Sequence, residues 1–348
     1  MEKVRSLQRG STLAVVSPSW EGPSLFPEVY ELGISRLRHE FGFQIKEYPT
    51  TRADGASNQK DPEARAQDII SAFNDSEVRG IISSIGGDDA VRLLPFLDQH
   101  HLSPKFFMGY SDSTVLLSYF HQRGFCTFHG PSVMAGFAEP GKLSDEFVAH
   151  VRDFLLTPWE YYTYRPYTHW TDEPMEWGKS VSLTKERSYS TNTGWKILNP
   201  ISNSCAEVKG ILWGGCLEAL EFIKGTKYWR SDEIFWKDKI LFFELSDETK
   251  NPVQLEWILR NYGGQGAFTH ARALLFGRFA RVSTEEREAL EQIVCKVVCG
   301  EYASSIPVIA NVDFGHTYPQ QIFPLGAEGK LTIVAEVVSL TIETPFTR

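Results

Sequence analysis

The sequence has no apolar stretch long enough to span a bilayer, and its first ten residues contain no apolar core of the kind that signal peptides carry. It also has no basic cluster: 35 Lys and Arg stand against 44 Asp and Glu, a formal net charge of −9. Nucleic-acid polymers are bound through a basic footprint that contacts their phosphates. We therefore expect a cytoplasmic protein without a membrane or nucleic-acid polymer as partner, although single nucleotides are not excluded.

Cysteine is scarce and follows no framework spacing. The odd number, five, fits reduced thiols in a reducing compartment. Cys295 and Cys299 share one helix face, but no second ligand pair follows, which argues against zinc. Cys126 lacks the local signature of a cysteine nucleophile. The cysteines thus indicate a compartment rather than a chemistry, and the other two are Cys205 and Cys216.

Short apolar runs alternate with segments of helical periodicity in the first part of the chain. Short links between them are typical of a parallel, doubly wound sheet. We predict an N-terminal α/β domain with such a sheet, flavodoxin-like or amidotransferase-like, whose ligand lies at the carboxyl ends of the strands. The expected strands are 13–16, 44–48, 80–85 and 105–108, and the expected helices are 30–37, from 61 on, 90–97 and 113–121.

The second half of the chain predicts another α/β unit after an interruption. Residues 158–204 show no clear periodicity, and a segment of this length is usually a functional loop or a connection. Beyond it we expect strands at 209–213, 240–243, 273–276, 308–311 and 331–337, with helices at 252–261 and from 284 on. The predicted parts are an N-terminal domain, 1–157, a linker or functional loop that contains tryptophans, 158–204, and a C-terminal α/β domain, 205–348.

Ser111, in Gly109-Tyr110-Ser111-Asp112, lies between an expected strand and an expected helix. A serine on such a sharp turn can be a nucleophile, and the backbone N–H of Asp112 could bind an oxyanion. The elbow pattern Gly-x-Ser-x-Gly has Ser113 in its last position here, so the motif is incomplete. The alternative is a serine that caps the helix.

Gly86 and Gly87 also follow a strand, and adjacent glycines let backbone N–H groups approach a ligand closely. They could supply the other oxyanion N–H, or simply form a turn. A serine nucleophile also needs a base and an orienting acid. His129 and His316, each next to a glycine near a strand end, are the candidate bases. Glu244, at the end of an apolar run, is the candidate acid, or pairs with solvent or an arginine.

Taken together, these segments resemble the LD-carboxypeptidase family of serine peptidases. They occur in family order and span nearly the whole chain. The matching pieces are Val16-Ser17-Pro18-Ser19, Asp61 to Asp68 with Arg65, Ile85-Gly86-Gly87, Gly109 to Thr114, His129-Gly130-Pro131, Trp213-Gly214-Gly215-Cys216-Leu217, Phe243-Glu244 and Gly315-His316.

The resemblance implies a Ser-Glu-His triad split between two domains. It makes Ser111 the nucleophile, Glu244 the orienting acid and His316 the base. The oxyanion hole would be formed by the backbone of Asp112 and the Gly86-Gly87 turn. The resemblance implies no metal and no organic cofactor, and because the family is commonly dimeric, it implies a homodimer.

The family has two main branches, which differ in substrate. One trims murein tetrapeptides in peptidoglycan recycling. The other, of the microcin C self-immunity type, cuts the bond between an amino acid or peptide and a nucleotide-like moiety, which gives antibiotic resistance, and has a tryptophan-bearing loop between its domains. Trp177 and Trp195 resemble that loop and favour this branch, since aromatic faces stack on bases; the alternative is that they pack the domain interface. Where many members have Asn, this chain has Cys216, which leaves that substrate contact open.

Three hypotheses therefore compete. The first is a peptidase or amidohydrolase for peptidyl or aminoacyl nucleotides, and the second is a murein LD-carboxypeptidase with the same triad. The third is a small-molecule binding protein on a degenerate hydrolase scaffold, which is disfavoured because all three triad positions are filled.

Overall fold

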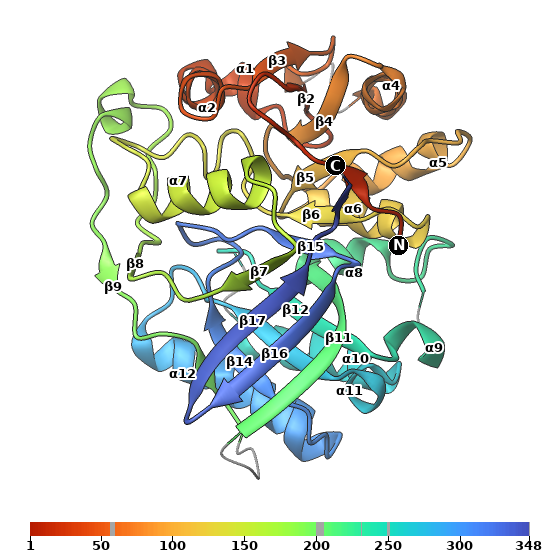
Figure 1. Ribbon diagram of the computed structural model, residues 1–348, viewed down its shortest axis with the longest axis vertical. Coiled ribbons are helices and arrows are strands. Elements are labelled where there is room, and N and C mark those ends of the chain that lie inside the picture. Colours follow the sequence, from red (N-terminus) through yellow and green to blue (C-terminus); the bar gives the residue numbers. More distant parts are fainter. Residues whose placement is uncertain (56–59, 200–204, 231, 249–250, 348) are drawn as a thin grey trace.

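The computed structural model describes residues 1–55, 60–199, 205–230, 232–248 and 251–347. The chain builds two β-sheets with flanking helices: the N-terminal one lies in the upper part of Figure 1 and the C-terminal one in the lower part. Within the described ranges, no helix is both long enough and apolar enough to cross a membrane. Cys126, Cys216, Cys295 and Cys299 are free thiols, whereas the side chain of Cys205 lies outside the described residues.

The N-terminal sheet has six strands in the order β15-β6-β5-β4-β2-β3. Five of them are parallel, and β15 (Phe323–Leu325), from near the chain's end, pairs antiparallel with β6. The order of the parallel strands is that of flavodoxin-like sheets, so the predicted doubly wound domain is confirmed. The parallel strands are β2 (Thr12–Val16), β3 (Gln44–Glu47), β4 (Val78–Ser83), β5 (Phe106–Gly109) and β6 (Thr127–His129).

Two helices of this half, α4 and α6, begin where the sequence indicates, whereas α2 begins at Pro27, before the expected start at residue 30. Asp61 caps α4 by accepting a hydrogen bond from the backbone N–H of Ala64 at 2.8 Å, with Pro62 in the first turn. The expected helix at 90–97 is a 3₁₀ turn, Ala90–Leu93, followed by the short α5. The helices are α1 (Gly22–Leu25), α2 (Pro27–His39), α4 (Pro62–Asn74), α5 (Leu94–Leu97), α6 (Ser113–Gln122) and α7 (Asp145–Val151).

The C-terminal sheet has eight strands in the order β10-β14-β13-β12-β11-β16-β17-β7. Its centre, β11 to β14, is parallel, so β11, β12 and β14 end at the same edge. A capping box of Ser283 and Glu286 opens α12, the helix expected from residue 284 on. The strands are β7 (Tyr161–Tyr164), β10 (Lys196–Ile197), β11 (Cys205–Cys216), β12 (Lys239–Glu244), β13 (Ala273–Gly277), β14 (Val308–Val312), β16 (Glu328–Val334) and β17 (Val337–Glu343); the helices are α8 (Leu217–Ile223), α9 (Glu233–Trp236), α10 (Pro252–Gly264), α11 (Ala267–His270) and α12 (Thr284–Cys295).

The single strand expected at 331–337 is two strands of a hairpin, β16 and β17. Ala335 and Glu336 form its two-residue turn with φ of 47° and 67°. Such turns normally carry Asn or Gly because both positions need positive φ. Neither residue is present here, so the sequence gives no turn signal.

The segment 158–204 contributes strands to the C-terminal sheet and forms a small sheet of its own. Its β7 and β10 form the two edges of the C-terminal sheet, and β8 (His169–Trp170) pairs with β9 (Ser190–Thr191). These strands have two to four residues, too few to show a period. The predicted boundary at 204 lies outside the described residues.

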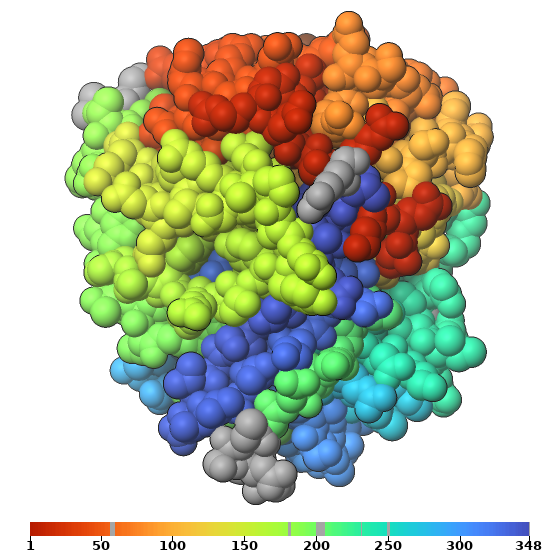
Figure 2. All heavy atoms as spheres, viewed as in Figure 1, coloured from red at the N-terminus to blue at the C-terminus, as the bar shows by residue number. Residues whose placement is uncertain are grey.

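The chain's two ends lie together. β1 (Val4–Arg5) pairs in parallel with β18 (Phe346–Thr347). On the face shown in Figure 2, the blue C-terminal residues accordingly touch the red N-terminal ones. With β15 in the N-terminal sheet, this pairing joins the two halves through backbone hydrogen bonds at two places.

Candidate active site

Ser111 lies on a strained turn between β5 and α6. Its φ is 56°, in the left-handed region that residues with a side chain rarely adopt. Gly109 ends β5 and Ser113 begins α6, so the turn is as short as a strand-to-helix elbow requires. Gly109 has no room for a side chain, because a Cβ there would lie 2.7 Å from Oγ of Ser83. Ser111 is therefore held out of the regular backbone beside a helix N-terminus.

The Gly86-Gly87 loop lies directly against this elbow. A Cβ on Gly86 would stand 2.7 Å from Cβ and 2.8 Å from Oγ of Ser111. Gly87 has φ of 145°, and a Cβ there would collide with Ser19. The loop therefore approaches the serine at a distance that only glycine permits, which brings its backbone near the backbone N–H of Asp112.

The side chain of Asp112 fixes the loop to the elbow. Its Oδ2 accepts hydrogen bonds from the backbone N–H groups of Asp89, at 3.0 Å, and Ala90, at 2.8 Å. Asp89 is also bound by the buried Arg65, at 2.5 Å, and Arg65 donates to the carbonyl of Pro18 at 2.8 Å. The carboxylate of Asp112 thus holds the loop in place, whereas its backbone N–H remains available to a ligand in the cavity.

Glu244 and His316 form a hydrogen-bonded pair at the C-terminal sheet. Nδ1 of His316 lies 2.7 Å from Oε2 of Glu244, and because an ionised carboxylate only accepts, the imidazole N–H donates. Glu244 is the last residue of β12 and is fully buried. His316 follows β14 and retains an exposed edge of 11%. The two residues are 72 positions apart and meet because parallel strands end at one edge.

The electrostatics of the pair favour an imidazolium–carboxylate couple. Burial disfavours the charge on Glu244, but the positive charge of His316 and the hydrogen bond that His316 donates lower the pKa of the carboxyl below its ordinary value. Burial likewise opposes the charge on His316, but the Glu244 carboxylate raises the pKa of the imidazole above its ordinary value. Gly315 makes the close approach possible: its φ is 95°, and a Cβ there would lie 2.8 Å from Oε2 of Glu244.

The two candidate bases occupy different positions. His316 lines the cavity that also contains Ser111. His129 is 1% exposed, with its Nε2 3.6 Å from Oε1 of Glu244. The geometry therefore favours His316 as the residue that could exchange a proton with a substrate.

A cavity of about 740 Å³ brings most of the predicted site residues together. Glu244 lies behind His316 rather than on the wall. The predicted residues on the wall are Gly86, Gly87, Ser111, Asp112, Trp177, Cys216 and His316. Cys216 ends β11, and its backbone N–H donates to Oγ1 of Thr114 in α6 at 3.2 Å, so the contact joins the serine's helix to the C-terminal sheet.

The two tryptophans separate. Trp177 lines the cavity and stacks on Trp20, with ring centroids 5.8 Å apart. Trp195 does not belong to the described residues that line the cavity. It is buried, and its Nε1–H donates a hydrogen bond to Oδ2 of Asp313 at 2.8 Å. The prediction that Trp195 binds substrate is therefore corrected, since its polar atom and its faces are used within the fold.

Sequence reasoning missed several wall residues. Trp20 comes from the loop after β2, and Arg187 pairs with Glu139 across the cavity wall at a very short distance. Tyr189 also donates to Glu139, at 3.1 Å. None of these positions has a local motif, so the sequence offered no signal for them.

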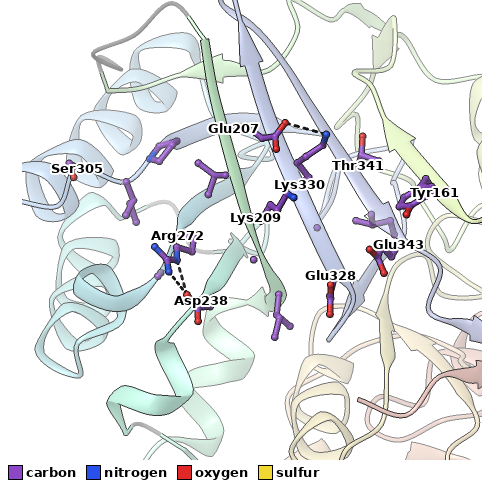
Figure 3. Close-up of a pocket in the computed structure, with 18 residues that line it drawn as sticks. Tyr161, Glu207, Lys209, Asp238, Arg272, Ser305, Glu328, Lys330, Thr341 and Glu343 are labelled. Atoms are coloured by element: carbon purple, nitrogen blue, oxygen red, sulfur yellow. Dashed lines mark hydrogen bonds and ion pairs between the residues drawn. The ribbon is translucent and has the colours of Figure 1, made fainter.

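A second, larger hollow of about 1190 Å³ lies over β11, β16 and β17, with none of the predicted site residues on its wall (Figure 3). Four of its charged side chains form two ion pairs, Glu207 with Lys330 at 3.2 Å and Asp238 with Arg272 at 2.6 Å. No group of three or more His, Cys, Asp and Glu residues is arranged to hold a metal ion anywhere in the described ranges. We therefore place the candidate site at the Ser111 cavity.

Comparisons with known proteins agree with this location. Residues 13–130 match the LD-carboxypeptidase N-terminal domain, and residues 209–331 match the LD-carboxypeptidase C-terminal domain. The microcin C7 self-immunity protein MccF of Escherichia coli is 28% identical over 284 residues, covering 80% of this chain and 78% of MccF.

Two solved structures resemble this one over nearly their full length. An MccF-like protein from Streptococcus pneumoniae, solved in complex with AMP, has a TM-score of 0.84 at 27% identity and covers 96% of this chain and 99% of its own. MccF in complex with aspartyl sulfamoyl adenosine has a TM-score of 0.82 at 23% identity and covers 100% of both chains, which shows a shared fold. The chain belongs to the LD-carboxypeptidase family of serine peptidases.

Proposed function

We propose that this peptidase hydrolyses the bond between an amino acid or peptide and a nucleotide-like moiety, with Ser111 as nucleophile, His316 as base and Glu244 as orienting acid. The observation that carries the proposal is His316, hydrogen-bonded to the buried Glu244 behind it, on the wall of the cavity that holds Ser111 on its strained turn. Hydrolysis of this kind would inactivate an aminoacyl-nucleotide antibiotic. The expected homodimer is part of the same proposal.

The reaction follows from the positions of these groups. Oγ of Ser111 attacks the carbonyl carbon, and its proton passes to Nε2 of His316 in the neutral imidazole form, whose Nδ1–H is held by Glu244. The negative oxygen is bound by backbone N–H groups of Asp112 and the Gly86-Gly87 loop. His316 then protonates the leaving nitrogen, and the acyl–Ser111 ester remains.

Water completes the cycle. His316 takes a proton from a water molecule that attacks the ester, and returns it to Oγ of Ser111 when the amino acid or peptide leaves. Each step uses one base and one oxyanion site, so the chain's own residues supply all the groups that the reaction needs.

The nucleotide-like part is assigned to the aromatic wall. Trp177 and Trp20 stack with an angle of 28° between their planes, and Phe26 contacts Trp177 edge-on at 5.6 Å. A base that stacks on such a face gains roughly 1–3 kcal/mol. The relatives support a nucleotide-like ligand, because an MccF-like protein has been solved with AMP and MccF with aspartyl sulfamoyl adenosine.

The direct test is incubation of the purified protein with an aminoacyl-sulfamoyl adenosine, with mass spectrometry of the released amino acid. We expect release from this compound, and we expect Trp177→Ala to raise KM by about tenfold because a stacking face is lost. Trp257→Ala is the matched control, since Trp257 is 65% exposed on α10, away from the cavity. Turnover of a murein tetrapeptide in place of the nucleoside, unaffected by Trp177→Ala, would assign the protein to the murein branch.

The charges of the cavity predict which aminoacyl groups are preferred. The two arginines on its wall are paired, Arg187 with Glu139 and Arg281 with Asp247. Glu218 and Glu248 lie on the same wall. A substrate carboxylate would meet like charge, which is unfavourable, whereas a cationic side chain would not.

We therefore expect kcat/KM for lysyl-sulfamoyl adenosine to exceed that for the glutamyl compound by about tenfold or more. Glu248→Lys should reduce this ratio or invert it. Glu288→Lys, an equal charge change on the exposed face of α12, should leave the ratio unchanged. Equal rates for the two compounds in the native protein would refute the preference.

A further inference from the structure

A second imidazole approaches Glu244 from the opposite sheet. His129 ends β6, next to β5, where it pairs in register with Gly109 at the base of the serine elbow. Its Nε2 lies 3.6 Å from Oε1 of Glu244, the carboxylate oxygen that His316 does not use. Glu244 therefore stands between an imidazole of the C-terminal half and an imidazole of the N-terminal half.

The polar atoms at this contact have no other partner. The two ring nitrogens of His129 and Oε1 of Glu244 are all buried. None of these three atoms has a hydrogen bond to any described residue. The rest of the His129 ring faces aromatic side chains: Tyr110 at 6.2 Å, Phe242 at 5.8 Å and Phe314 at 6.0 Å between centroids. The carboxylate is thus the polar group within reach of the imidazole, and buried polar groups are normally hydrogen-bonded.

The contact crosses the boundary between the two sheets. Ser111 and His129 come from neighbouring strands of the N-terminal sheet, whereas Glu244 and His316 come from the C-terminal sheet. Any rotation of one sheet against the other would change the distance from Ser111 to His316. A bond from His129 to Glu244 would resist that change at the carboxylate itself.

We propose that His129 is a positioning residue whose Nε2, 3.6 Å from Oε1 of Glu244 in this structure, closes on that oxygen to donate a hydrogen bond and so holds the Glu244–His316 pair in register with Ser111. The proposal rests on the proposed function, because it assigns these three residues their roles. His129 does not touch substrate and acts through Glu244.

The effect on His316 can be given a sign. The charged and titratable groups around the pair are Glu218 of α8, Cys216 of β11, Asp247 after β12 and Tyr110 after β5. A substitution of His129 leaves all four of these groups in place. A donor on Oε1 draws negative charge away from the Nδ1 side, so its removal strengthens the attraction of Glu244 for the His316 proton and raises the pKa of His316.

The experiment compares the native protein with His129→Phe, which removes the donors, and His129→Gln, which retains one. For His129→Phe we expect kcat to fall roughly 10- to 100-fold with KM little changed, and the acid limb of the kcat/KM profile to move to higher pH. His129→Gln should recover most of both losses. His121→Phe is the matched control, because His121 is 6% exposed at the end of α6 and should leave the pH profile unchanged.

A second measurement separates this proposal from the proposed function. The pKa of His316, read by ¹⁵N NMR of its imidazole, needs no substrate and should rise in His129→Phe but not in His121→Phe. An unmoved His316 pKa, or an unmoved acid limb with unchanged kcat, would overturn the role of His129. Absence of turnover by the native protein, together with a shifted His316 pKa, would instead overturn the proposed function and leave the contact standing.

Discussion

We expect Ser111→Ala to lower kcat by about 10⁴- to 10⁶-fold and to leave KM nearly unchanged, because only the attacking oxygen is lost. The aromatic wall, the loop at Gly86 and the Glu244–His316 pair do not depend on that hydroxyl. The residual rate comes from the oxyanion site and from binding. The measurement is single-turnover release of the amino acid from the aminoacyl-sulfamoyl adenosine.

Two variants control for this result. Ser118→Ala removes another buried hydroxyl of α6 and should retain full activity. Ser111→Gly should be as inactive as Ser111→Ala but more stable by about 1 kcal/mol, because glycine relieves the left-handed φ of 56°. Activity that survives in Ser111→Ala would remove the serine from the mechanism.

We expect Glu244→Gln to lower kcat by about 10³- to 10⁴-fold, because an amide can hold the imidazole in the wrong tautomer and cannot stabilise its charged form. The negative charge of Glu244 raises the pKa of His316 above the ordinary histidine value of about 6.5. We therefore expect the acid limb of kcat/KM in the native protein to lie above that pH. With that charge removed, the pKa of His316 falls and the limb moves to lower pH. This shift is opposite to the one expected for His129→Phe.

The pH dependence of kcat/KM in both proteins provides the test. Glu291→Gln is the control, since Glu291 is a buried carboxylate of α12 that pairs with Lys196 away from the cavity. An acid limb that does not move in Glu244→Gln would mean that His316 is not the group whose titration controls the rate.

The sequence allowed prediction of features that local chemistry determines. The apolar run before Gly109 and the helical period after Ser113 place Ser111 on a turn without any knowledge of the tertiary structure. Strand–helix alternation likewise predicts a parallel sheet, which brings the ends of β12 and β14 to one edge. The meeting of Glu244 with His316, however, came from the resemblance, because no local pattern relates residues so far apart.

The remaining features depend on three-dimensional packing. The sequence around Trp177 and Trp195 does not distinguish their roles. In the structure, Trp195 donates a hydrogen bond to the buried carboxylate of Asp313, whereas Trp177 stacks on Trp20. In sequence, His129 and His316 are equally good candidate bases, because each lies next to a glycine. Its position behind Glu244 follows from the contact of two sheets, which a linear pattern does not record.

The central claim, that Ser111 is activated by the Glu244–His316 pair, is tested most directly by reaction with a fluorophosphonate followed by peptide mapping. We expect one adduct, on Ser111, that forms at least about a hundredfold more slowly in Glu244→Gln and does not form in Ser111→Ala. An adduct on another residue, or a rate on Ser111 that is unchanged in Glu244→Gln, would contradict it.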